Sequence, residues 1–329
     1  MIAVSYHDSI AELQGLIGCA RGAGPFARPE WFARLEHSEP DPLYVCARQG
    51  EAALVLPLAG RDGALHALRN WYAFSWAPLG RMEQPLLTAI AVDLARRAHR
   101  VVLEPLSADN AAPLLSAFNA AGWRCDQQIC DANHYLLTRG RTFAAYLAER
   151  PGQLRSTLRR KTGALTVQIT SECSDADWAA YAQIYDDSWK PAEGDAALLR
   201  DFAQSEAAHG RLRLGFALHT GQPVAAQMWT VDGGVAYIHK LAHLRSAQHL
   251  SPGTVLTAAL IEYAFVNDKV GEIDFGTGDD PYKRLWMDEC RPRYRLDCLE
   301  PRQPAAWPAL ARRYARRLSR RLAPGPARR

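Results

Sequence analysis

The sequence predicts an α/β (α+β) protein of two related units, each a mixed, mostly antiparallel sheet with helices on both faces. Three observations support this fold class. The chain has 329 residues, about twice the length of a typical domain. Each half contains three apolar segments joined by short turns. A helix, a strand, a helix and a strand follow each triplet, and an antiparallel triplet followed by a β-α-β step gives a mixed sheet.

The C-terminal half shows this order most clearly. We expect a strand over 164–171, helices over 177–189 and 195–209, strands over 212–219, 224–231 and 235–242, a helix over 251–267, a strand over 272–275, a helix around 281–288 and a strand near 294–299. Glycines at 221, 233 and 234 supply the positive φ of hairpin turns. Pro252 suits a first helical turn, because its missing N–H has no partner there.

The N-terminal half repeats the order more faintly. We expect strands over 3–6, 43–48, 54–59, 65–71, 101–104 and 135–139, with helices over 10–17, 30–35, 84–98 and 110–120. The agreement predicts an internal duplication. The expected divisions are a degenerate unit over 1–140, a catalytic unit over 141–300 and a tail over 301–329.

Charge is distributed unevenly along the chain. The net charge is +4, from 39 basic and 35 acidic residues. Residues 301–329 hold nine Arg and no acidic residue, so the rest carries a net charge of −5. Such a body is not expected to bind nucleic acid over a folded face. Seven Cys without a C-x-x-C pair predict reduced, buried thiols. No leader or membrane-spanning pattern appears, so we expect a cytoplasmic location.

The segment QHLSPGT at 248–254 follows the third hairpin strand and opens a helix. Gly253 and the N–H groups of a first helical turn suit an anion such as a pyrophosphate. His243, Arg245 and His249 flank the loop, and no acidic residue lies between 241 and 260. An ordinary helix start explains the same residues, and the two interpretations stay open.

The segment DFGTGDDPYK at 274–283 joins a strand end to a helix start. Its two glycines allow the backbone to approach a ligand closely. Asp274, Asp279, Tyr282 and Lys283 are therefore candidate functional side chains. The spacing of the aspartates matches no metal-binding loop, so no metal is expected. Solvated Asp caps remain an alternative for Asp279 and Asp280.

Further candidate positions carry charge or aromatic surface. Lys240 lies inside an apolar strand and must be paired or face a cleft, and strand alternation predicts that His239 and Lys240 point to opposite faces. Trp189 is expected in the core more than at a ligand. Arg155 and Arg159 share a helix face, which suits either an anion clamp or a solvated linker helix.

The motifs of serine hydrolases, zinc enzymes and P-loop proteins are absent. The order of elements, with the segments at 155–161, 188–190, 237–240, 251–253 and 274–283, resembles the GNAT acyltransferase superfamily. The likeness is to its FemAB-like, CelD-like acetyltransferase 6 branch and covers roughly residues 145–290. The N-terminal half resembles the degenerate first GNAT unit of FemAB-type tandem proteins.

The resemblance implies transfer of an acyl group from acyl-CoA to an amine or hydroxyl of a sugar, polysaccharide precursor or amino compound. It implies Tyr282 as general acid, with Asp274 or Lys240 handling the acceptor proton. The residues implied to contact the donor are Leu241, Ala242, Gln248, His249, Ser251, Gly253 and Thr254. Those implied to contact the acceptor are Trp189, Lys190, Gln227, Tyr237, Lys283, Arg155 and Arg159.

The expected donor is not unique. An aminoacyl-tRNA donor of the Fem type remains open, although the sequence lacks the heptad insertion of the tRNA-using enzymes. A non-catalytic accessory role in envelope polysaccharide synthesis also remains open. The R/Q-x-x-G-x-G/A signature of small GNAT enzymes is absent.

The tail predicts a basic amphipathic helix. Trp307, Leu310, Tyr314, Leu318 and Leu322 recur at steps of three and four residues, with Arg pairs between them. Three placements stay open: packing on the body, an anionic membrane surface at the inner face, or RNA. The sequence does not indicate an oligomeric state.

Overall fold

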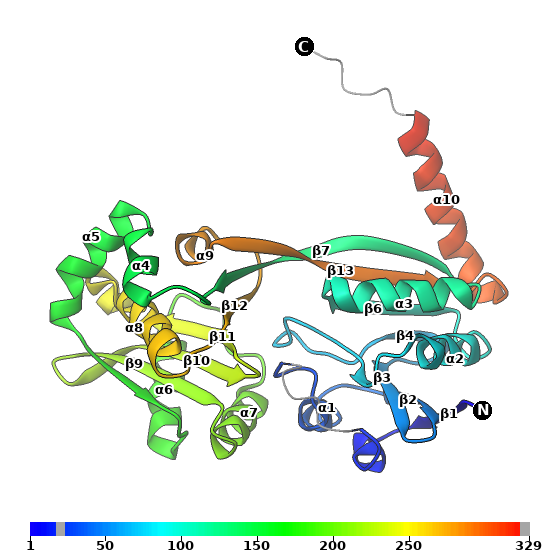
Figure 1. Ribbon diagram of the computed structural model, residues 1–329, viewed down its shortest axis with the longest axis horizontal. Coiled ribbons are helices and arrows are strands. Elements are labelled where there is room, and N and C mark those ends of the chain that lie inside the picture. Colours follow the sequence, from blue (N-terminus) through cyan, green and yellow to red (C-terminus); the bar gives the residue numbers. More distant parts are fainter. Residues whose placement is uncertain (18–23, 323–329) are drawn as a thin grey trace. The chain divides into compact units, whose positions relative to one another are not determined.

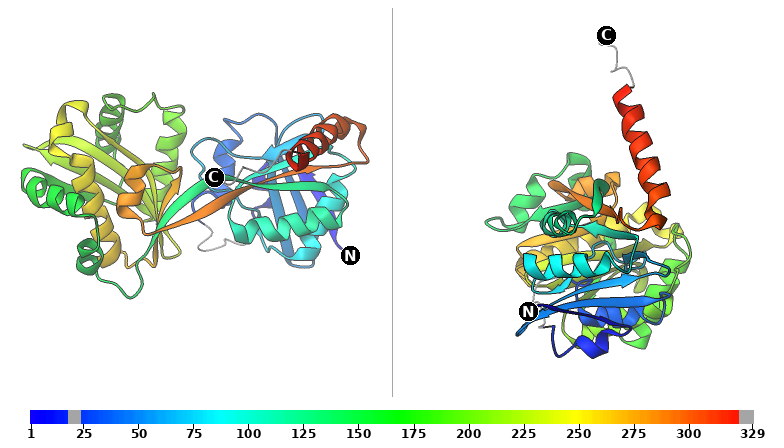
Figure 2. Two further views of the ribbon diagram at one scale, coloured as in Figure 1. Left: turned by 90° about the horizontal axis from the view of Figure 1, so that it is seen from above. Right: turned by 90° about the vertical axis from the view of Figure 1, so that its right-hand side faces the viewer.

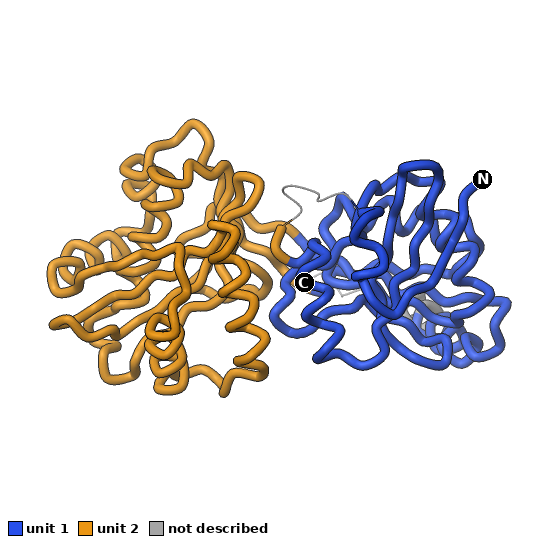
Figure 3. The backbone as a smooth tube through the Cα atoms, turned by 90° about the horizontal axis from the view of Figure 1, so that it is seen from below, with its two compact units in different colours: residues 1–20, 26–130, 292–329 blue, residues 21–25, 131–291 orange. Residues whose placement is uncertain are grey.

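The computed structural model describes residues 1–17 and 24–322, with side chains as far as residue 316. The chain forms two compact units (Figure 3). Unit 1 comprises residues 1–20, 26–130 and 292–329, and unit 2 comprises residues 21–25 and 131–291. Both are mixed α/β structures with mostly antiparallel sheets, which confirms the predicted fold class.

Unit 1 holds a sheet in the order β1-β2-β3-β4-β6-β13, and only β4 and β6 run parallel. Its elements are β1 (Ala3–His7), a 3-10 helix (Ile10–Leu13), α1 (Pro29–Leu35), β2 (Pro42–Gln49), β3 (Ala52–Ala59), β4 (Ala64–Ala67), β5 (Leu79–Gly80), α2 (Gln84–Leu94), β6 (Arg100–Leu106), α3 (Ala108–Ala120), the last part of β13 (Glu289–Leu299), a 3-10 helix (Pro304–Ala306) and α10 (Trp307–Leu322).

Unit 2 holds a sheet in the order β7-β12-β11-β10-β9-β8 (Figure 1). Its elements are the last part of β7 (Arg124–Leu137), α4 (Phe143–Ala148), α5 (Gly152–Lys161), a 3-10 helix (Thr162–Ala164), β8 (Thr166–Thr170), α6 (Asp175–Asp186), α7 (Ala196–Ala208), β9 (Leu212–His219), β10 (Gln222–Asp232), β11 (Val235–His243), a 3-10 helix (Arg245–Leu250), α8 (Pro252–Val266), β12 (Glu272–Thr277) and α9 (Pro281–Trp286).

The two units repeat one order of elements, as expected, but they exchange their last strands. In unit 1, β6 pairs with β13, so that Val101 lies opposite Cys298. In unit 2, β12 pairs with β7, so that Ile273 lies opposite Leu136. The observed units therefore differ from the expected divisions at residues 140 and 300. Strand order along a sequence does not reveal this exchange, because it does not say which neighbour each strand joins.

The core of unit 2 lies between the sheet and α8, with α4 and α5 covering the same helix (Figures 1 and 2). Trp229, Ile238, Leu256 and Ile273 are buried in it. α8 is apolar around most of its circumference, as a helix enclosed by protein must be. Each large side chain buried here contributes about 2 kcal/mol. α6 and α7 pack on the opposite face of the sheet.

The cysteines only partly match the expectation of buried thiols. Cys46 and Cys298 are buried, whereas Cys130 and Cys290 are exposed. The expectation is wrong for the exposed pair because residues 127–130 and 288–290 are exposed at consecutive positions of the two long strands. Cys19 lies outside the described residues.

Candidate functional site

The site lies where β11 and β12 separate. These strands run parallel, and Val235–Tyr237 pairs with Glu272–Asp274. The pairing ends there, although β11 continues to His243 and β12 to Thr277. The carboxyl ends of such strands are where α/β sheets bind ligands.

The first turn of α8 faces this opening. Ser251 adopts a left-handed conformation (φ 52°) just before the helix. Gly253 packs so closely on β11 that an added Cβ would lie 3.3 Å from Leu241 Cδ1 and 3.5 Å from His243 Cδ2. Within the described chain, no group accepts a hydrogen bond from the backbone N–H of Gly253. A free N–H at a helix start, together with the helix dipole, is the kind of arrangement that suits an anion.

The expected donor-binding residues gather around this helix start, with one qualification. Gln248 and His249 are exposed beside it, and Thr254 is half-buried in the first turn. Ala242 is fully buried and pairs with Ala226, so only its backbone remains for a donor.

A polar network lies directly behind the first turn of α8. Thr257 Oγ1 donates to the Gly253 carbonyl at 2.8 Å. The Tyr282 hydroxyl lies 2.9 Å from Thr257 Oγ1 and 3.3 Å from the same carbonyl. Gln227 Nε2 donates to Thr257 Oγ1 at 2.6 Å, and Trp229 Nε1 donates to Gln227 Oε1 at 2.8 Å.

This network corrects the expected role of Gln227. Its side chain is completely buried, and both ends of its amide are engaged. Gln227 therefore holds Thr257, the hydrogen-bond partner of Tyr282, and its buried amide is not exposed to a ligand. The sequence did not single out Thr257, which lies one helical turn after Gly253. The spacing of four residues, which puts Thr257 on the same face of α8 as Gly253, was the signal that could have identified it.

Tyr282 enters the site because α9 begins immediately after the Gly-rich turn. Asp280 caps this short helix, since its Oδ1 accepts a 2.7 Å hydrogen bond from the Tyr282 N–H. Burial raises the pKa of Tyr282 to about 12, against the opposing effect of its hydrogen bond with Thr257. The phenol is thus protonated at neutral pH, as a general acid must be.

A β-bulge overturns the expected orientation of His239 and Lys240. Trp229 pairs with Ile238 and Met228 pairs with Lys240, which leaves His239 as an extra residue in β11. The bulge shifts the alternation of side chains by one position. The expectation of opposite faces is therefore wrong.

Both side chains point toward α6 and α7. His239 Nε2 lies 2.8 Å from Thr230 Oγ1, and its ring packs against Phe202 of α7. Lys240 Nζ lies 3.1 Å from Glu193 Oε1, in an ion pair that is almost completely buried. Burial lowers the pKa of Lys240, and Glu193 opposes that shift.

Lys190 joins the same group of charges. Lys190 Nζ and Lys240 Nζ lie 6.0 Å and 5.2 Å from the centroid of the Tyr185 ring on α6. Burial, with the positive charges of Lys240 and Lys283, lowers the pKa of Lys190 to about 8. A lysine in this state is neutral in a large fraction of molecules at mildly alkaline pH.

Trp189 lies on the surface and not in the core. Its side chain is 51% exposed, and its ring centroid lies 4.4 Å from that of His243. The expectation of a core position is wrong because α6 has already ended at Asp186, and the chain turns outward there. Tyr237 packs against Gly24. A Cβ added to Gly24 would lie 3.1 Å from the hydroxyl oxygen of Tyr237.

Asp274 is buried at the centre of an ion-pair network. Its Oδ1 accepts hydrogen bonds from Asn133 Nδ2 and the Gly276 N–H, both at 2.7 Å. Its Oδ2 lies 2.9 Å from Arg291 Nη2, which also pairs with Glu272 at 2.5 Å. Sequence reasoning missed Asn133 and Arg291, because they come from the long strands β7 and β13 and share no local pattern with Asp274.

The rest of the Gly-rich segment is also tied to protein. Lys283 Nζ donates to the Thr277 carbonyl, and burial lowers the pKa of Lys283. Asp279 lies 2.9 Å from the buried His134 and pairs with Arg284, and these two partners lower its pKa to about 2. Within residues 1–17 and 24–322, no group of three His, Cys, Asp or Glu is arranged to hold a metal ion.

Arg155 and Arg159 lie on α5. Arg155 Nε donates to the Arg150 carbonyl at 3.1 Å, and Arg159 is exposed. α5 packs into the core through Leu154 and Leu158.

Residues 149–284 match the model of the acetyltransferase 6 family, described as an acetyltransferase (GNAT) domain. No curated protein sequence matches the chain significantly.

Solved structures share the fold at low identity. FemX gives a TM-score of 0.65 at 10% identity, covering 90% of this chain and 96% of that one. L-PGS from Bacillus licheniformis gives 0.57 at 11% identity, covering 88% and 92%. A tandem GNAT protein from the clavulanic acid biosynthesis pathway gives 0.51 at 15% identity, covering 90% and 98%.

Proposed function

We propose that unit 2 is an acyltransferase. The expected resemblance to GNAT domains, which is confirmed over residues 149–284, supports this proposal. The observation that carries the proposal is the position of Tyr282. Its protonated hydroxyl lies at the first turn of α8, beside the point where β11 and β12 separate. In this proposal, an acid for a leaving group and a site for an anion would occupy one place.

We propose acyl-CoA as the donor. Its pyrophosphate is the anion that the start of α8 would accept, and the close packing of Gly253 on Leu241 provides a surface without a side chain there. Ser251 and Thr254 lie at the same helix start, and Gln248 and His249 flank it. The expectation that these residues contact the donor remains a proposal.

In the proposed reaction, an amine or hydroxyl of the acceptor attacks the carbonyl carbon of a thioester. A backbone N–H of β11 would stabilise the resulting oxyanion. Tyr282 would protonate the departing thiolate, and a base would take the proton of the acceptor. Asp274 is engaged by Asn133, Arg291 and the Gly276 N–H, and Lys240 is paired with Glu193, so we propose both as candidates for that base.

The acceptor class remains open among sugars, polysaccharide precursors and amino compounds. Trp189 and Lys190 lie beside the site, and we propose that they contact the acceptor. Tyr237 and Lys283 retain that proposed role, whereas Arg155 and Arg159 would meet only a long acceptor.

A release assay for free thiol tests the proposal. Acetyl-CoA and longer acyl-CoA thioesters are incubated with the full chain and mixtures of amino sugars and amino compounds. We expect thiol release that depends on both donor and acceptor. Release no faster than without protein, across all donors, would remove acyl-CoA as the donor.

A second candidate donor is aminoacyl-tRNA, retained because FemX and L-PGS share the tandem fold. Transfer from a charged tRNA pool that ribonuclease abolishes would favour this donor. Absence of both transfer reactions and of donor binding would favour a non-catalytic accessory role. We also propose a cytoplasmic location, in which the six described cysteines stay free.

A further inference from the structure

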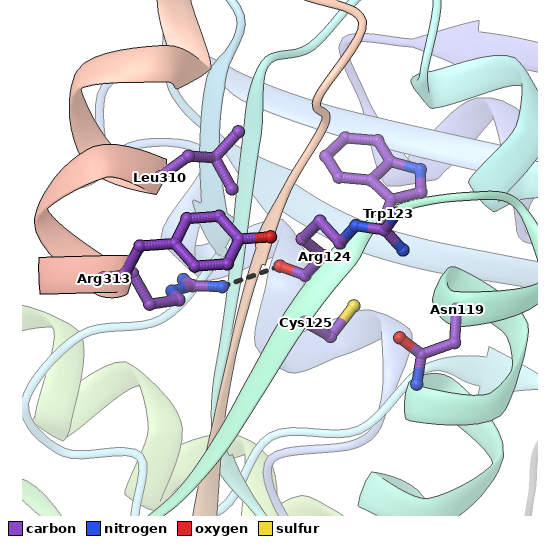
Figure 4. Close-up of a pocket in the computed structure, with 7 residues that line it drawn as sticks. Asn119, Trp123, Arg124, Cys125, Leu310 and Arg313 are labelled. Atoms are coloured by element: carbon purple, nitrogen blue, oxygen red, sulfur yellow. Dashed lines mark hydrogen bonds between the residues drawn. The ribbon is translucent and has the colours of Figure 1, made fainter. Parts of the chain in front are cut away.

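α10 contacts unit 1 through Arg313 on its basic side. Figure 4 shows Arg313 reaching from α10 to the strands of unit 1, beside a pocket of about 100 Å³. Arg313 Nη1 donates to the Arg124 carbonyl at 2.7 Å, and Nη2 donates to the Asp297 carbonyl at 3.0 Å. The Arg313 side chain is only 14% exposed. Arg313 therefore anchors α10 on unit 1, and Leu310 and Tyr314 of the stripe line the adjoining pocket.

The two aromatic side chains of the apolar stripe are more than half exposed to solvent. Trp307 is 58% exposed and Tyr314 is 56% exposed, while Ala311 and Ala315 on the same side are also exposed. Leu310 and Tyr314 both line the pocket beside Trp123. Aromatic side chains at positions i and i+7 lie on one face of a helix, so Trp307 and Tyr314 form one surface.

The polar side of α10 carries only positive charge. Arg312 and Arg316 are exposed, and the helical segment contains no Asp or Glu. The backbone stays helical to Leu322, and the sequence continues the pattern with Arg and Leu. Figures 1 and 2 show α10 leaving the end of β13 and extending away from the strands of unit 1.

We propose that α10 binds an anionic membrane surface, with Trp307 and Tyr314 entering the interface and Arg312 and Arg316 contacting lipid phosphates. An exposed aromatic stripe bordered by arginines fits the boundary between headgroups and acyl chains. RNA would satisfy the arginines but would not require a continuous apolar stripe. No described helix is long and apolar enough to cross a membrane, so the contact is peripheral. The proposal does not depend on the acyltransferase activity.

Flotation of the full chain with vesicles tests this inference. One vesicle type holds phosphatidylcholine with 30% phosphatidylglycerol, and the other holds phosphatidylcholine alone. We expect binding to the anionic vesicles that weakens as salt rises from 50 to 300 mM. Arg312→Gln/Arg316→Gln should lower the partition coefficient about 30-fold, because each lost charge costs about fivefold.

The apolar part of the contact has its own matched control. Trp307→Ser/Tyr314→Ser should also lower partitioning at least tenfold, whereas Trp71→Ser should not, although Trp71 is exposed to the same 58%. Arg48→Gln/Arg81→Gln, at two exposed positions outside α10, controls for net charge. Circular dichroism and thermal unfolding confirm that each variant is folded.

Two results would overturn the inference. One is equal binding to both vesicle types, or none to either, by the folded wild-type chain. The other is loss of vesicle binding in the arginine variant with full retention in Trp307→Ser/Tyr314→Ser. If that second pattern accompanies binding of a single-stranded RNA oligonucleotide, α10 is an RNA-binding helix instead.

Discussion

The hydroxyl of Tyr282 on α9 lies 2.9 Å from Oγ1 of Thr257 on α8, so the start of one helix is joined to the first turns of another. This contact holds the phenol at the opening between β11 and β12, where the proposed thiolate would leave. Burial keeps its pKa near 12. The phenol therefore keeps its proton throughout the neutral range.

Tyr282→Phe should lower kcat at least 100-fold, because it removes the general acid. The melting temperature should fall by only a few degrees, since a net hydrogen bond contributes about 1 kcal/mol. Thiol release at saturating donor and thermal unfolding measure the two effects. Wild-type kcat in a folded Tyr282→Phe variant would exclude Tyr282 as the acid.

Thr257→Val separates the positioning of the Tyr282 hydroxyl from its proposed role as general acid. It keeps the Tyr282 hydroxyl but removes the partner that positions it. We expect a smaller loss of kcat than in Tyr282→Phe, with thiol release measured from pH 7 to 10. Since the pKa of Tyr282 is about 12, the wild-type rate should not fall over this range through loss of its proton.

Lys190 should titrate near pH 8. Burial and the charge on Lys240 disfavour its protonated form. Its rate of acetylation by acetic anhydride, followed by mass spectrometry, should reach half its plateau near that pH. Exposed Lys269 in the same digest is the internal control.

The neighbour effect is tested by Lys240→Met. Removal of a positive charge, and release of Glu193 from its ion pair, should both raise the pKa of Lys190. The half-plateau pH for Lys190 should therefore move upward. No movement, or movement downward, would show that the two lysines are not coupled.

Asp274→Asn should mainly lower the stability of the folded protein. It breaks the ion pair with Arg291 in a buried site, so the free energy of unfolding should fall by about 3 kcal/mol in urea titration. Glu272→Gln, which affects the same arginine from a more exposed position, should cost less. Unchanged stability with a 100-fold lower kcat would instead make Asp274 the base.

The sequence allowed the order of elements and the start of α8 to be predicted, because hairpin turns and Pro252 are local signals. It did not reveal that β6 pairs with β13 and β12 with β7, since strand partners are a property of the folded sheet. The prediction from side-chain alternation failed at His239, because a β-bulge makes this residue an extra one in β11. The amino-acid composition of the strand gives no sign of the bulge.

The candidate site was predicted where its residues are close in sequence and incompletely where they are not. Tyr282 and Gly253 belong to two local segments, and the structure brings these segments together. Asn133 and Arg291 reach Asp274 from more than 15 residues away in sequence, so no spacing indicated them. Gln227 is a polar residue of the kind expected in a binding site, but its side chain is completely buried.

Calorimetric titration of acetyl-CoA into the wild-type chain and into Gly253→Val tests the central claim most directly. A side chain at Gly253 would press on Leu241 and His243 and cover the start of α8. Gly152→Ala, at the start of α5 where an added Cβ meets nothing within 4 Å, is the matched control. We predict saturable binding to the wild-type and Gly152→Ala proteins, weakened at least tenfold in folded Gly253→Val. Absence of binding to the wild type, or equal affinity in all three proteins, would contradict a donor site at α8.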